Sequence, residues 1–588
     1  MVFEKNKTVI AASILAIITL LVWLPVTGFG FVWDDNQFLK SELYFHNFDL
    51  FLQALQSPFF VSQNYYRPLP LIVLYLVGDD AVSASPYHWL LLCIHLANTL
   101  LLFSLLLILL KNSSFRVPVA LIAALFFAVN PVTTEVVAWI SGIFDGLFAT
   151  FAILLFLVDF RARSTSVRLV LIFFLYLCAA LTKEMAAAFV LIFPVWHFFL
   201  MKAGLLNWKE LSERKRLVCT YTACFFAGIT YLLIRYFTLG YLYIPSGVDL
   251  YSEGVAFRVG LIVKAIGYYI LHLLYPVWDI SPVNPVDSKL VFSSNTDFVY
   301  FAAGSLLIMT VTFAALKRKW NILLPLALFL ASIFPVLHLM PMSIGDNFAH
   351  LRFIYFPLMV ALLGLAIVIG KVSIRFTPGA WFASGLVVLL LIAVTRSVTP
   401  FWVNDYTFWH WVKSIKPSSA TAKTNYYAAL ASHGECEVVL REAFPDFKNN
   451  NGTLPLLTTI AGCFAEKGDV AVSEKLYEIV MADFYVQGFS GYDKRVASIY
   501  LNIATMYFNN PAEGRLNKAE GLVEAALQIE PGNLKGIILS AKIAISQSDE
   551  PLVKRQILRA MEVVSGLDRE ESIKMLSEEL GVSVSKYL

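Results

Sequence analysis

The chain of 588 residues is 58% hydrophobic and only 15% charged, with a mean hydropathy of +0.69. Soluble domains have a lower apolar share and a higher charged share, so this composition excludes a wholly soluble protein and predicts a polytopic protein of the lipid bilayer. The formal net charge of +3 is close to neutral for this length and gives no indication of nucleic-acid binding.

The N-terminal segment is predicted to be an uncleaved first span. Lys5 and Lys7 precede an apolar run, and no small-residue cleavage site follows that run. Basic clusters recur between later apolar runs, and placing them all in the cytoplasm satisfies the positive-inside rule. We therefore expect a cytoplasmic N-terminus and an integral membrane protein with segments 29–87, 134–143, 240–297, 339–353 and everything after about 398 on the opposite side.

Apolar stretches long enough to cross a bilayer, roughly 17 to 22 residues each, recur along the first two thirds of the chain. Residues 257–275 are also apolar enough, but a crossing there would move Lys317, Arg318 and Lys319 to the outer side. We therefore expect a re-entrant or interfacial helix over 257–275. The expected spans are 8–28, 88–110, 117–133, 144–160, 167–182, 185–201, 217–239, 298–316, 321–338, 354–371 and 380–397.

The segment after the first span, 29–87, is predicted to be a long outer loop with a helix near 48–56. Its sequence "FVWDDNQFL" places Asp34 and Asp35 directly beyond the membrane, among aromatic residues. An isolated acidic pair commonly caps a helix. Here the position at the membrane surface, the aromatic neighbours and Arg67 as a possible cationic partner favour a functional role instead.

Charged residues also occur at the outer ends of later spans. Glu135 and Asp145 flank one turn, Lys183 and Glu184 lie in another, and Arg352 precedes the tenth span. A charge buried at membrane depth costs on the order of 3 kcal/mol, so these groups are expected to face a cavity or one another and to outline an outward-facing polar site. The alternatives are an interfacial ion pair at Lys183 and Glu184, and an Arg352 that snorkels to the headgroups instead of binding a phosphate.

Nothing in the sequence calls for a metal or a nucleotide. The histidines are scattered without ligand spacing, and no phosphate loop or dinucleotide fingerprint is present. We therefore expect no metal site, no cofactor and no cradle for a nucleotide sugar. His95 and Asn98, one turn apart, are expected to form hydrogen bonds between helices.

The tail from about Phe401 is polar and is predicted to be a separate soluble domain, so that the chain divides into 1–400 and 401–588. Two segments, 501–509 and 516–533, have the small and aromatic positions of a tetratricopeptide hairpin. Segments 423–434, 459–481 and 534–564 resemble further copies, and three or four units suffice for a small solenoid. A generic bundle of helical hairpins is the alternative.

Two of the six cysteines, Cys436 and Cys463, lie in this tail. The expected topology puts the tail in an oxidising compartment, where disulfides form, so we expect these two to be joined. Two free buried thiols remain the alternative, because a disulfide needs Cα atoms close together and sequence does not show that distance. The other four cysteines are expected to pack within the spans.

An acidic pair in the first outer loop of a multi-span protein resembles the C-type glycosyltransferases, which use lipid-phosphate sugars. More closely, the order of motifs along nearly the whole chain resembles the transmembrane and tetratricopeptide-repeat O-mannosyltransferases, most simply a bacterial relative. One departure is that Ile143 and Phe144 precede Asp145 where the family typically has an Arg. The motifs are "WDD" (33–35), "YRPL" (66–69), "HLANTLL" (95–101), "NPVTTEVVAWISG" (130–142), "LTKE" (181–184) and "RFIY" (352–355).

The resemblance implies an all-α polytopic bundle of the C-type glycosyltransferase kind with a C-terminal α-solenoid. It implies transfer of a sugar, most simply mannose, from a polyprenyl-phosphate donor to a hydroxyl of an exported protein or glycan, with inversion. The repeat domain would lie in the periplasm of a bacterium, or in the lumen of a eukaryotic compartment, and would dock the acceptor or a partner. The lipid chain would lie in a groove bordered by 257–275.

Residue roles follow from the same resemblance. One of the two adjacent carboxylates would be the general base and the other would orient a loop or a cation, with Asp35 slightly favoured over Asp34 as the base. Arg352, and second Lys183, would bind the donor phosphate. The remaining substrate-binding candidates are Tyr66, Arg67, Glu135, Asp145, Glu184 and Tyr355.

Three other functions remain open at this point. A ligase for whole lipid-linked oligosaccharides would favour large late loops, whereas the late loops here are short. A transporter or flippase of a lipid-linked precursor would concentrate its functional residues near the midplane of two matching halves. A membrane-anchored repeat scaffold predicts no function for Asp34 and Asp35.

Overall fold

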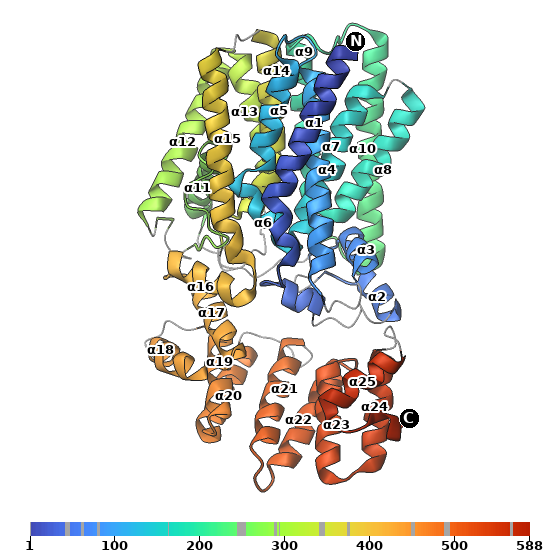
Figure 1. Ribbon diagram of the computed structural model, residues 1–588, viewed down its shortest axis with the longest axis vertical. Coiled ribbons are helices and arrows are strands. Elements are labelled where there is room, and N and C mark those ends of the chain that lie inside the picture. Colours follow the sequence, from blue (N-terminus) through green and yellow to red (C-terminus); the bar gives the residue numbers. More distant parts are fainter. Residues whose placement is uncertain are drawn as a thin grey trace. The chain divides into compact units, whose positions relative to one another are not determined.

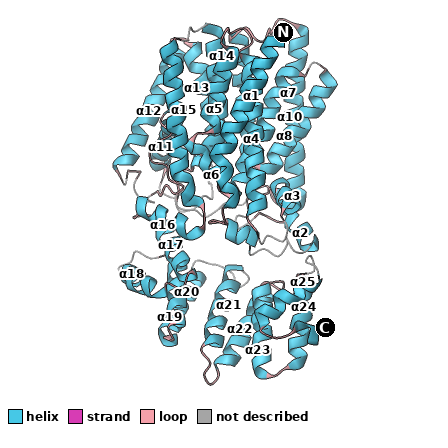
Figure 2. Cartoon of the chain, viewed as in Figure 1, coloured by secondary structure: helices cyan, strands magenta, loops and turns pink. Residues whose placement is uncertain are grey.

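The computed structural model describes residues 2–40, 48–59, 64–78, 83–162, 164–243, 254–286, 291–292, 294–339, 347–372, 377–448, 453–486, 494–564 and 569–588. These residues form helices joined by turns, and the one pairing of extended backbone among them is an isolated bridge between Pro285 and Asn347 (Figure 2). The chain divides into two compact units, one of residues 1–36, 55–79 and 83–404, and one of residues 37–54, 80–82 and 405–588.

The first unit is a bundle of long apolar helices (Figure 1). Many large apolar side chains stay exposed on its outward helix faces, such as Phe225 and Phe237 of α10, as expected for surfaces that face lipid. Its helices are α1 (Val2–Trp23), α3 (Pro68–Val77), α4 (Ser85–Leu109), α5 (Arg116–Ala128), α6 (Thr134–Val137), α7 (Ile143–Arg161), α8 (Thr165–Thr182), α9 (Phe189–Lys202), α10 (Leu211–Leu239), α11 (Val255–Leu274), α12 (Asn295–Leu316), α13 (Trp320–Ile333), α14 (Tyr355–Val372) and α15 (Pro378–Val398).

By length and composition, ten helices in the described part of the chain can cross a membrane, or eleven if one bent pair counts as a span. Nine of these ten helices match expected spans, and the remaining one is α11. Two expected spans differ. The stretch 117–133 is the bent pair, with α5 and the segment Pro131–Val137 at 50°, and the stretch 321–338 is a shorter apolar helix, Trp320–Val336. Proline accompanies both differences. Pro131, which cannot donate a backbone hydrogen bond, opens the turn at the bend, and Pro335 lies in the 3-10 turn Phe334–Val336 at which α13 ends.

Helix α11 runs parallel to α12. Gly260 lies against Val291, Lys264 pairs with Asp297, and Gly267 lies against Tyr300, so the contacts advance in the same direction along both helices. A Cβ at Gly267 would come within 1.6 Å of the Tyr300 carbonyl oxygen, so only glycine permits this close approach.

The chain therefore returns toward the beginning of α11 before α12 starts. His272 Nε2 lies 3.3 Å from the Asp279 carbonyl, and Asn284 donates to the Tyr268 hydroxyl, which places the returning segment alongside the last turns of α11. Such a return is what a re-entrant helix over 257–275 requires, whereas a helix that lies in the membrane interface would not run alongside the candidate span α12. The side of the membrane on which each end lies stays a prediction.

The second unit is an α-solenoid of helical hairpins. In the described residues, the first helices of four successive hairpins begin at Ala420, Leu454, Lys494 and Leu534, and the first spacing equals the tetratricopeptide period of 34 residues. The expected repeat segments thus fold as hairpins. The helices of the solenoid are α16 (Asp405–Ile415), α17 (Ala420–Ser432), α18 (Cys436–Lys448), α19 (Leu454–Glu466), α20 (Val470–Val486), α21 (Lys494–Asn509), α22 (Arg515–Ile529), α23 (Leu534–Gln547), α24 (Glu550–Val563) and α25 (Arg569–Leu580). The helix expected near 48–56 is α2 (Phe48–Leu55), which follows the acidic pair in the sequence.

The expected disulfide joins the first two hairpins. Cys436 at the start of α18 is bonded to Cys463 in α19, with a Cα–Cα distance of 5.1 Å, and both side chains are buried. The alternative of two free thiols is therefore wrong, and the crosslink connects consecutive repeats.

Reduction of this disulfide is expected to lower the free energy of unfolding of the solenoid by about 3.5 kcal/mol, because the bond closes a 27-residue separation in the unfolded chain. For a domain of this size the loss corresponds to about 10 °C in Tm. Circular dichroism of the whole protein in detergent, with and without reductant, measures it. The double variant Cys436→Ser/Cys463→Ser should show no response to reductant, and a wild type equally unresponsive would contradict the expectation.

Candidate functional site

The acidic pair lies in a strained turn that follows the first helix and the 3-10 turn Leu24–Gly28. Trp33 has a φ of 56°, a left-handed conformation that is unusual for a bulky side chain. Its ring stacks on the ring of Trp139, with centroids 5.1 Å apart, and the Trp139 indole N–H donates to the Val32 carbonyl at 3.0 Å. The turn that carries the carboxylates is thus held against the segment that precedes α7.

The two neighbouring carboxylates have different surroundings. Asp35 is 0% exposed, its Oδ1 accepts hydrogen bonds from the Ser141 N–H and hydroxyl, both at 3.0 Å, and its Oδ2 accepts one from the Val32 N–H at 3.3 Å. Asp34 is partly exposed. Asp35 therefore joins the two segments, and Asp34 is the more exposed member of the pair.

Burial raises the pKa of Asp35 from 3.8 to about 8, against the opposing effect of the hydrogen bonds from Ser141 and Val32. The folded protein then keeps a proton that the unfolded chain releases. Asp35 contributes stability that is complete below pH 4 and is lost as the pH rises through about 8.

We expect the Tm of the wild type to fall between pH 5 and pH 8, with a contribution from Asp35 of up to about 1.4 kcal/mol per pH unit. Asp35→Asn should flatten this dependence, because asparagine keeps the size and an acceptor for Ser141 but does not titrate. Thermal unfolding at a series of pH values measures the slope, and Asp34→Asn is the matched control. Equal slopes in the wild type and Asp35→Asn would contradict the assigned protonation.

A break between α5 and α6 positions Glu135. The bend frees the carbonyls of Ala128 and Val129, which side chains from three other helices then satisfy. Trp23 of α1 donates to Ala128 O at 2.7 Å, His95 of α4 donates to the same oxygen at 2.9 Å, and Thr395 of α15 donates to Val129 O at 2.9 Å. The break is therefore built into the bundle, and the short helix α6 that follows it carries Glu135.

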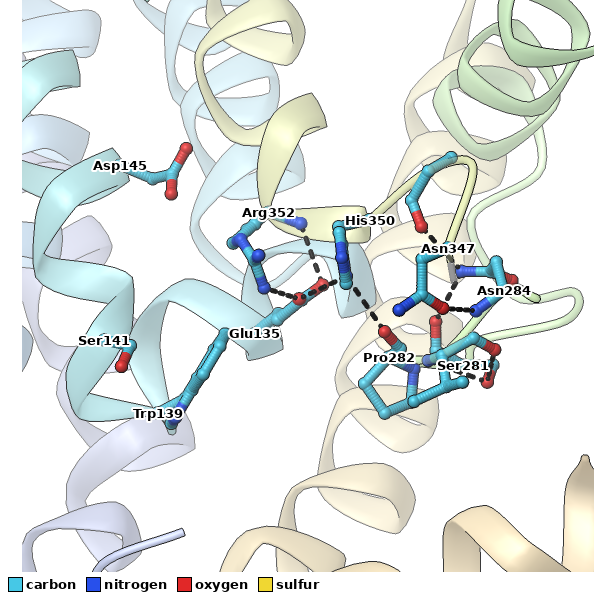
Figure 3. Close-up of polar contacts among 12 residues, drawn as sticks. Glu135, Trp139, Ser141, Asp145, Ser281, Pro282, Asn284, Asn347, His350 and Arg352 are labelled. Atoms are coloured by element: carbon cyan, nitrogen blue, oxygen red, sulfur yellow. Dashed lines mark hydrogen bonds and ion pairs between the residues drawn. The ribbon is translucent and has the colours of Figure 1, made fainter. Parts of the chain in front are cut away.

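Glu135 forms a buried hydrogen-bonded cluster with the turn before α14 (Figure 3). Its Oε1 accepts from Arg352 Nη1 at 2.8 Å and lies 3.4 Å from His350 Nδ1, and its Oε2 accepts from the Arg352 backbone N–H at 2.9 Å. Glu135 is 1% exposed and the Arg352 side chain is 16% exposed. The cluster therefore presents the guanidinium, and not the carboxylate, to solvent.

The other predicted charges also pair with one another. Arg67, just before α3, makes a two-pronged contact with Glu184, with Nη2–Oε2 at 2.6 Å and Nε–Oε2 at 3.0 Å. Lys183 forms an ion pair with Asp145 at the start of α7. Asp145 Oδ2 is buried and accepts no hydrogen bond from the described residues. The expectation that these groups face one another is confirmed, and the interfacial pair of Lys183 with Glu184 does not form.

Aromatic rings connect the three ion pairs into one site. Arg352 lies 4.8 Å above the Trp139 ring, and Lys183 lies 4.7 Å from the Phe353 ring. Arg67 lies 4.0 Å from the Tyr65 ring and 5.2 Å from the Phe144 ring. Since Trp139 also stacks on Trp33, the acidic pair belongs to the same region. We call the six paired residues the charged cluster: Arg67, Glu135, Asp145, Lys183, Glu184 and Arg352.

Two predicted substrate-binding tyrosines lie elsewhere. Tyr355 is fully buried in the bundle, where its hydroxyl contacts His95 Nδ1 at 2.8 Å and Asn98 Nδ2 at 3.3 Å, so the expected helix-to-helix hydrogen bonds of His95 and Asn98 are confirmed. Tyr66 is buried too, and its neighbour Tyr65 contacts Arg67 instead. Tyr66 was a candidate because it begins the motif "YRPL", and a motif does not show which of two adjacent aromatic residues contacts Arg67.

Sequence reasoning missed Trp139 and Ser141 as parts of the site. Both lie within "NPVTTEVVAWISG", but a Trp near a membrane surface is commonly an interfacial residue, and a lone Ser has no distinguishing signal. Within the described residues, no group of three or more His, Cys, Asp or Glu side chains is placed to hold a metal ion.

An apolar groove lies along α14, the helix that follows Arg352. It has a volume of about 810 Å³ and is lined by α5, α11, α12, α13, α14 and α15. Along α14 its lining begins at Leu358, six residues after Arg352, and extends to Ile369. The helix α11 contributes Ile270, Leu271, Leu273 and Leu274 to its wall.

Comparison with known proteins gives two relatives of low identity. Protein O-mannosyl-transferase F38B6.6 of Caenorhabditis elegans is 23% identical over 449 residues, which cover 73% of this chain and 62% of that protein. Protein O-mannosyl-transferase TMTC3 of Homo sapiens is 21% identical over 609 residues, which cover 94% of this chain and 64% of that protein. The chain thus spans less than two thirds of the length of these relatives, and no protein-family model matches it.

The crystal structure of yeast Tom70 aligns with 79% of this chain and 92% of its own chain, at 13% identity and a TM-score of 0.25, which is too low to support an inference. The order of motifs, the membrane bundle followed by helical repeats, and the two matches to named relatives agree with one another. By these observations the chain is similar to the transmembrane and tetratricopeptide-repeat protein O-mannosyl-transferases.

Proposed function

We propose that this chain is an integral membrane glycosyltransferase that moves a mannose from a polyprenyl-phosphate donor to a hydroxyl of an exported protein or glycan. One observation carries the proposal. The acidic pair is linked to the charged cluster by Trp139, whose ring stacks on Trp33 and lies under the Arg352 guanidinium. The lining of the apolar groove begins about two turns farther along α14. An acid, a phosphate-binding cation and a lipid groove are the parts that this reaction needs.

Asp34 is the proposed general base. A base must reach the proton that it removes, and Asp34 is partly exposed whereas Asp35 is enclosed and accepts three hydrogen bonds. This assignment reverses the slight preference for Asp35 derived from the motif. Asp35 takes the other role foreseen for the pair, that of orienting the loop.

Arg352 is proposed to bind the donor phosphate. A guanidinium carries five N–H donors in a planar fork that suits phosphate oxygens, and among the described residues Glu135 engages one side-chain nitrogen of Arg352. Lys183, held by Asp145, is the second candidate. Glu135 and His350 then keep the guanidinium in place while the phosphate binds.

The polyprenyl chain is proposed to occupy the apolar groove. The groove is lined almost wholly by apolar side chains and follows α14 away from Arg352. A lipid that is bound there would present its phosphate toward Arg352 and its sugar toward the acidic pair. Arg67, Glu184 and Asp145 would contact the sugar or the acceptor, and the free Oδ2 of Asp145 suits a hydroxyl donor.

The proposed residues account for every bond formed and broken in the transfer step and for the proton that moves. The acceptor oxygen forms a bond to the anomeric carbon as its proton passes to the Asp34 carboxylate. The bond from that carbon to the phosphate oxygen breaks, polyprenyl phosphate leaves with the electron pair, and attack from the opposite face inverts the configuration. The cations stabilise the charge that develops on the leaving phosphate.

The proposed topology keeps the N-terminus in the cytoplasm and the solenoid in the opposite compartment, which in a bacterium is the periplasm. The disulfide of Cys436 and Cys463 supports this side, because such bonds persist in oxidising compartments. The solenoid would dock the acceptor protein or glycan on its helical surface.

Sugar transfer from synthetic polyprenyl-phosphomannose by the purified protein in detergent tests the proposal, with and without a cell-envelope extract as the acceptor. We expect acceptor-dependent consumption of the donor by the wild type and loss of turnover in Asp34→Asn. Thr220→Val, at a separate buried cluster, is the control for general damage to the bundle. No consumption under any acceptor condition would overturn the proposal.

Transport of a lipid-linked precursor is a second candidate, and one observation favours it. The break between α5 and α6 is a discontinuous helix of the kind that transporters use at their substrate sites. A flippase would move a fluorescent polyprenyl-phosphate lipid across the bilayer of reconstituted vesicles. It would keep this activity in Asp34→Asn, because transport requires no base.

A further inference from the structure

Asn284 lies in the segment that returns along α11, and its side chain amide contacts several parts of the bundle. It is 2% exposed. Its Nδ2 lies 3.1 Å from the Tyr268 hydroxyl, 3.1 Å from Ser281 O and 3.2 Å from Ala349 O. An amide nitrogen has two hydrogens, so at least one of them is shared among these three acceptors.

The same stretch of backbone holds the segment that leads to Arg352 (Figure 3). The Asn284 N–H donates to Asn347 Oδ1 at 2.7 Å, and the Phe348 N–H donates to Asn284 O at 3.0 Å. His350 Nδ1 lies 3.0 Å from Pro282 O. Residues 282–284 therefore contact 347–350 at four points, counting the side-chain contact with Ala349, and the next residues are the turn that carries Arg352.

We propose that Asn284 is a positioning residue that sets the placement of His350 and Arg352 against Glu135 and links this placement to α11, one of the six helices that line the groove. It does not touch the charged cluster itself. Its amide and backbone bridge three elements that are far apart in sequence, α11 through Tyr268, the returning segment through Ser281, and the segment 347–350.

Asn284 can affect Arg352 because the bonds between Arg352 and Glu135 tolerate only a small displacement of the segment before Arg352. Arg352 meets Glu135 both through Nη1 at 2.8 Å and through its backbone N–H at 2.9 Å, so a shift of the preceding segment breaks both bonds together. Binding groups must be held within about 0.5 Å by the residues that support them. Asn284 contacts both this segment and Tyr268, which is two residues from the groove-lining Ile270. The ring of Phe348 adds a second contact between the segment and α11, with its centroid 5.5 Å from that of Tyr268.

Thermal unfolding of the whole protein in detergent tests the link without any ligand, through a double-mutant cycle of Asn284→Asp with Arg352→Gln. Aspartate keeps the size of asparagine but directs an oxygen at the carbonyls of Ser281 and Ala349. We expect Arg352→Gln to lower the midpoint less than half as much in the Asn284→Asp background as in the wild type. Equal lowering in the two backgrounds would overturn the proposal.

Thr220→Val supplies the matched control for this cycle. Thr220 is also fully buried, and its hydroxyl contacts Asp159 at 2.9 Å and Arg168 at 3.1 Å in a cluster that shares no residue with the network of Asn284. Its effect on the midpoint should add to that of Arg352→Gln. Coupling of the same size as for Asn284→Asp would show a general softening of the bundle and would contradict a positioning role.

The consequence for ligand binding rests on the proposed function and is measured separately, with farnesyl phosphate and farnesol as probes. Asn284→Asp should weaken the binding of farnesyl phosphate about tenfold and that of farnesol less than twofold, since only the former needs Arg352. Equal losses for both probes would overturn the positioning proposal. If the wild type binds farnesol but not farnesyl phosphate, the proposal of a lipid-phosphate donor is wrong. The role of Asn284 is still tested in that case by the double-mutant cycle of thermal unfolding.

Discussion

Asp34→Asn is expected to lower kcat for mannose transfer about 10³-fold, within the range that a general base contributes, while the affinity for the donor changes less than about twofold. The substitution removes the proton acceptor and keeps the size of the side chain. The donor contacts proposed for Arg352 and Lys183 do not involve Asp34, so KM for the donor should stay near the wild-type value.

The companion variant Asp35→Asn distinguishes the two carboxylates. Asp35 accepts hydrogen bonds from Val32 and Ser141 and is fully buried, so its replacement should alter stability and loop placement more than the chemical step. Initial rates over a range of donor concentrations, with the melting temperature of each variant, measure both effects. A 10³-fold loss in Asp35→Asn together with near-normal turnover in Asp34→Asn would reverse the assignment.

Arg352→Met is expected to have the largest combined effect on stability and donor binding. Methionine leaves Glu135, which is 1% exposed, without its guanidinium partner, and removal of one member of a buried ion pair typically costs about 3 to 5 kcal/mol. Loss of the phosphate ligand should also raise KM for the donor, by about 100-fold for a charge-assisted contact worth about 2.7 kcal/mol.

A second substitution separates these two consequences. Glu135→Gln removes the unpaired charge, so the double variant Glu135→Gln/Arg352→Met should recover most of the lost stability but none of the donor affinity. Melting temperatures and binding of polyprenyl phosphate to the four proteins of the cycle measure the outcome. Recovery of donor affinity in the double variant would show that Arg352 acts only as a structural partner of Glu135.

The sequence by itself determined the features that depend on local composition. Apolar run length sets whether a segment can cross a membrane, so the bundle and its division from the repeat tail were predictable. The spacing of small and aromatic residues is likewise local, and it predicted the hairpin around 501–533. The cost of burying charge identified Glu135, Asp145, Lys183, Glu184 and Arg352 as a set that had to be satisfied together. Arg67 was expected to be a partner of the acidic pair, and the structure pairs it with Glu184 instead.

Only the tertiary structure decided which of these charges meet. Arg352 and Glu135 are 217 residues apart, and Arg67 and Glu184 are 117 apart, so their pairing depends on how separate helices pack and not on any local pattern. The same holds for Asp34 and Asp35, whose residue type is identical and whose burial differs because Ser141 and Val32 enclose one of them. Helix periodicity describes one element at a time, whereas burial, partner choice and the break before α6 arise where several elements meet.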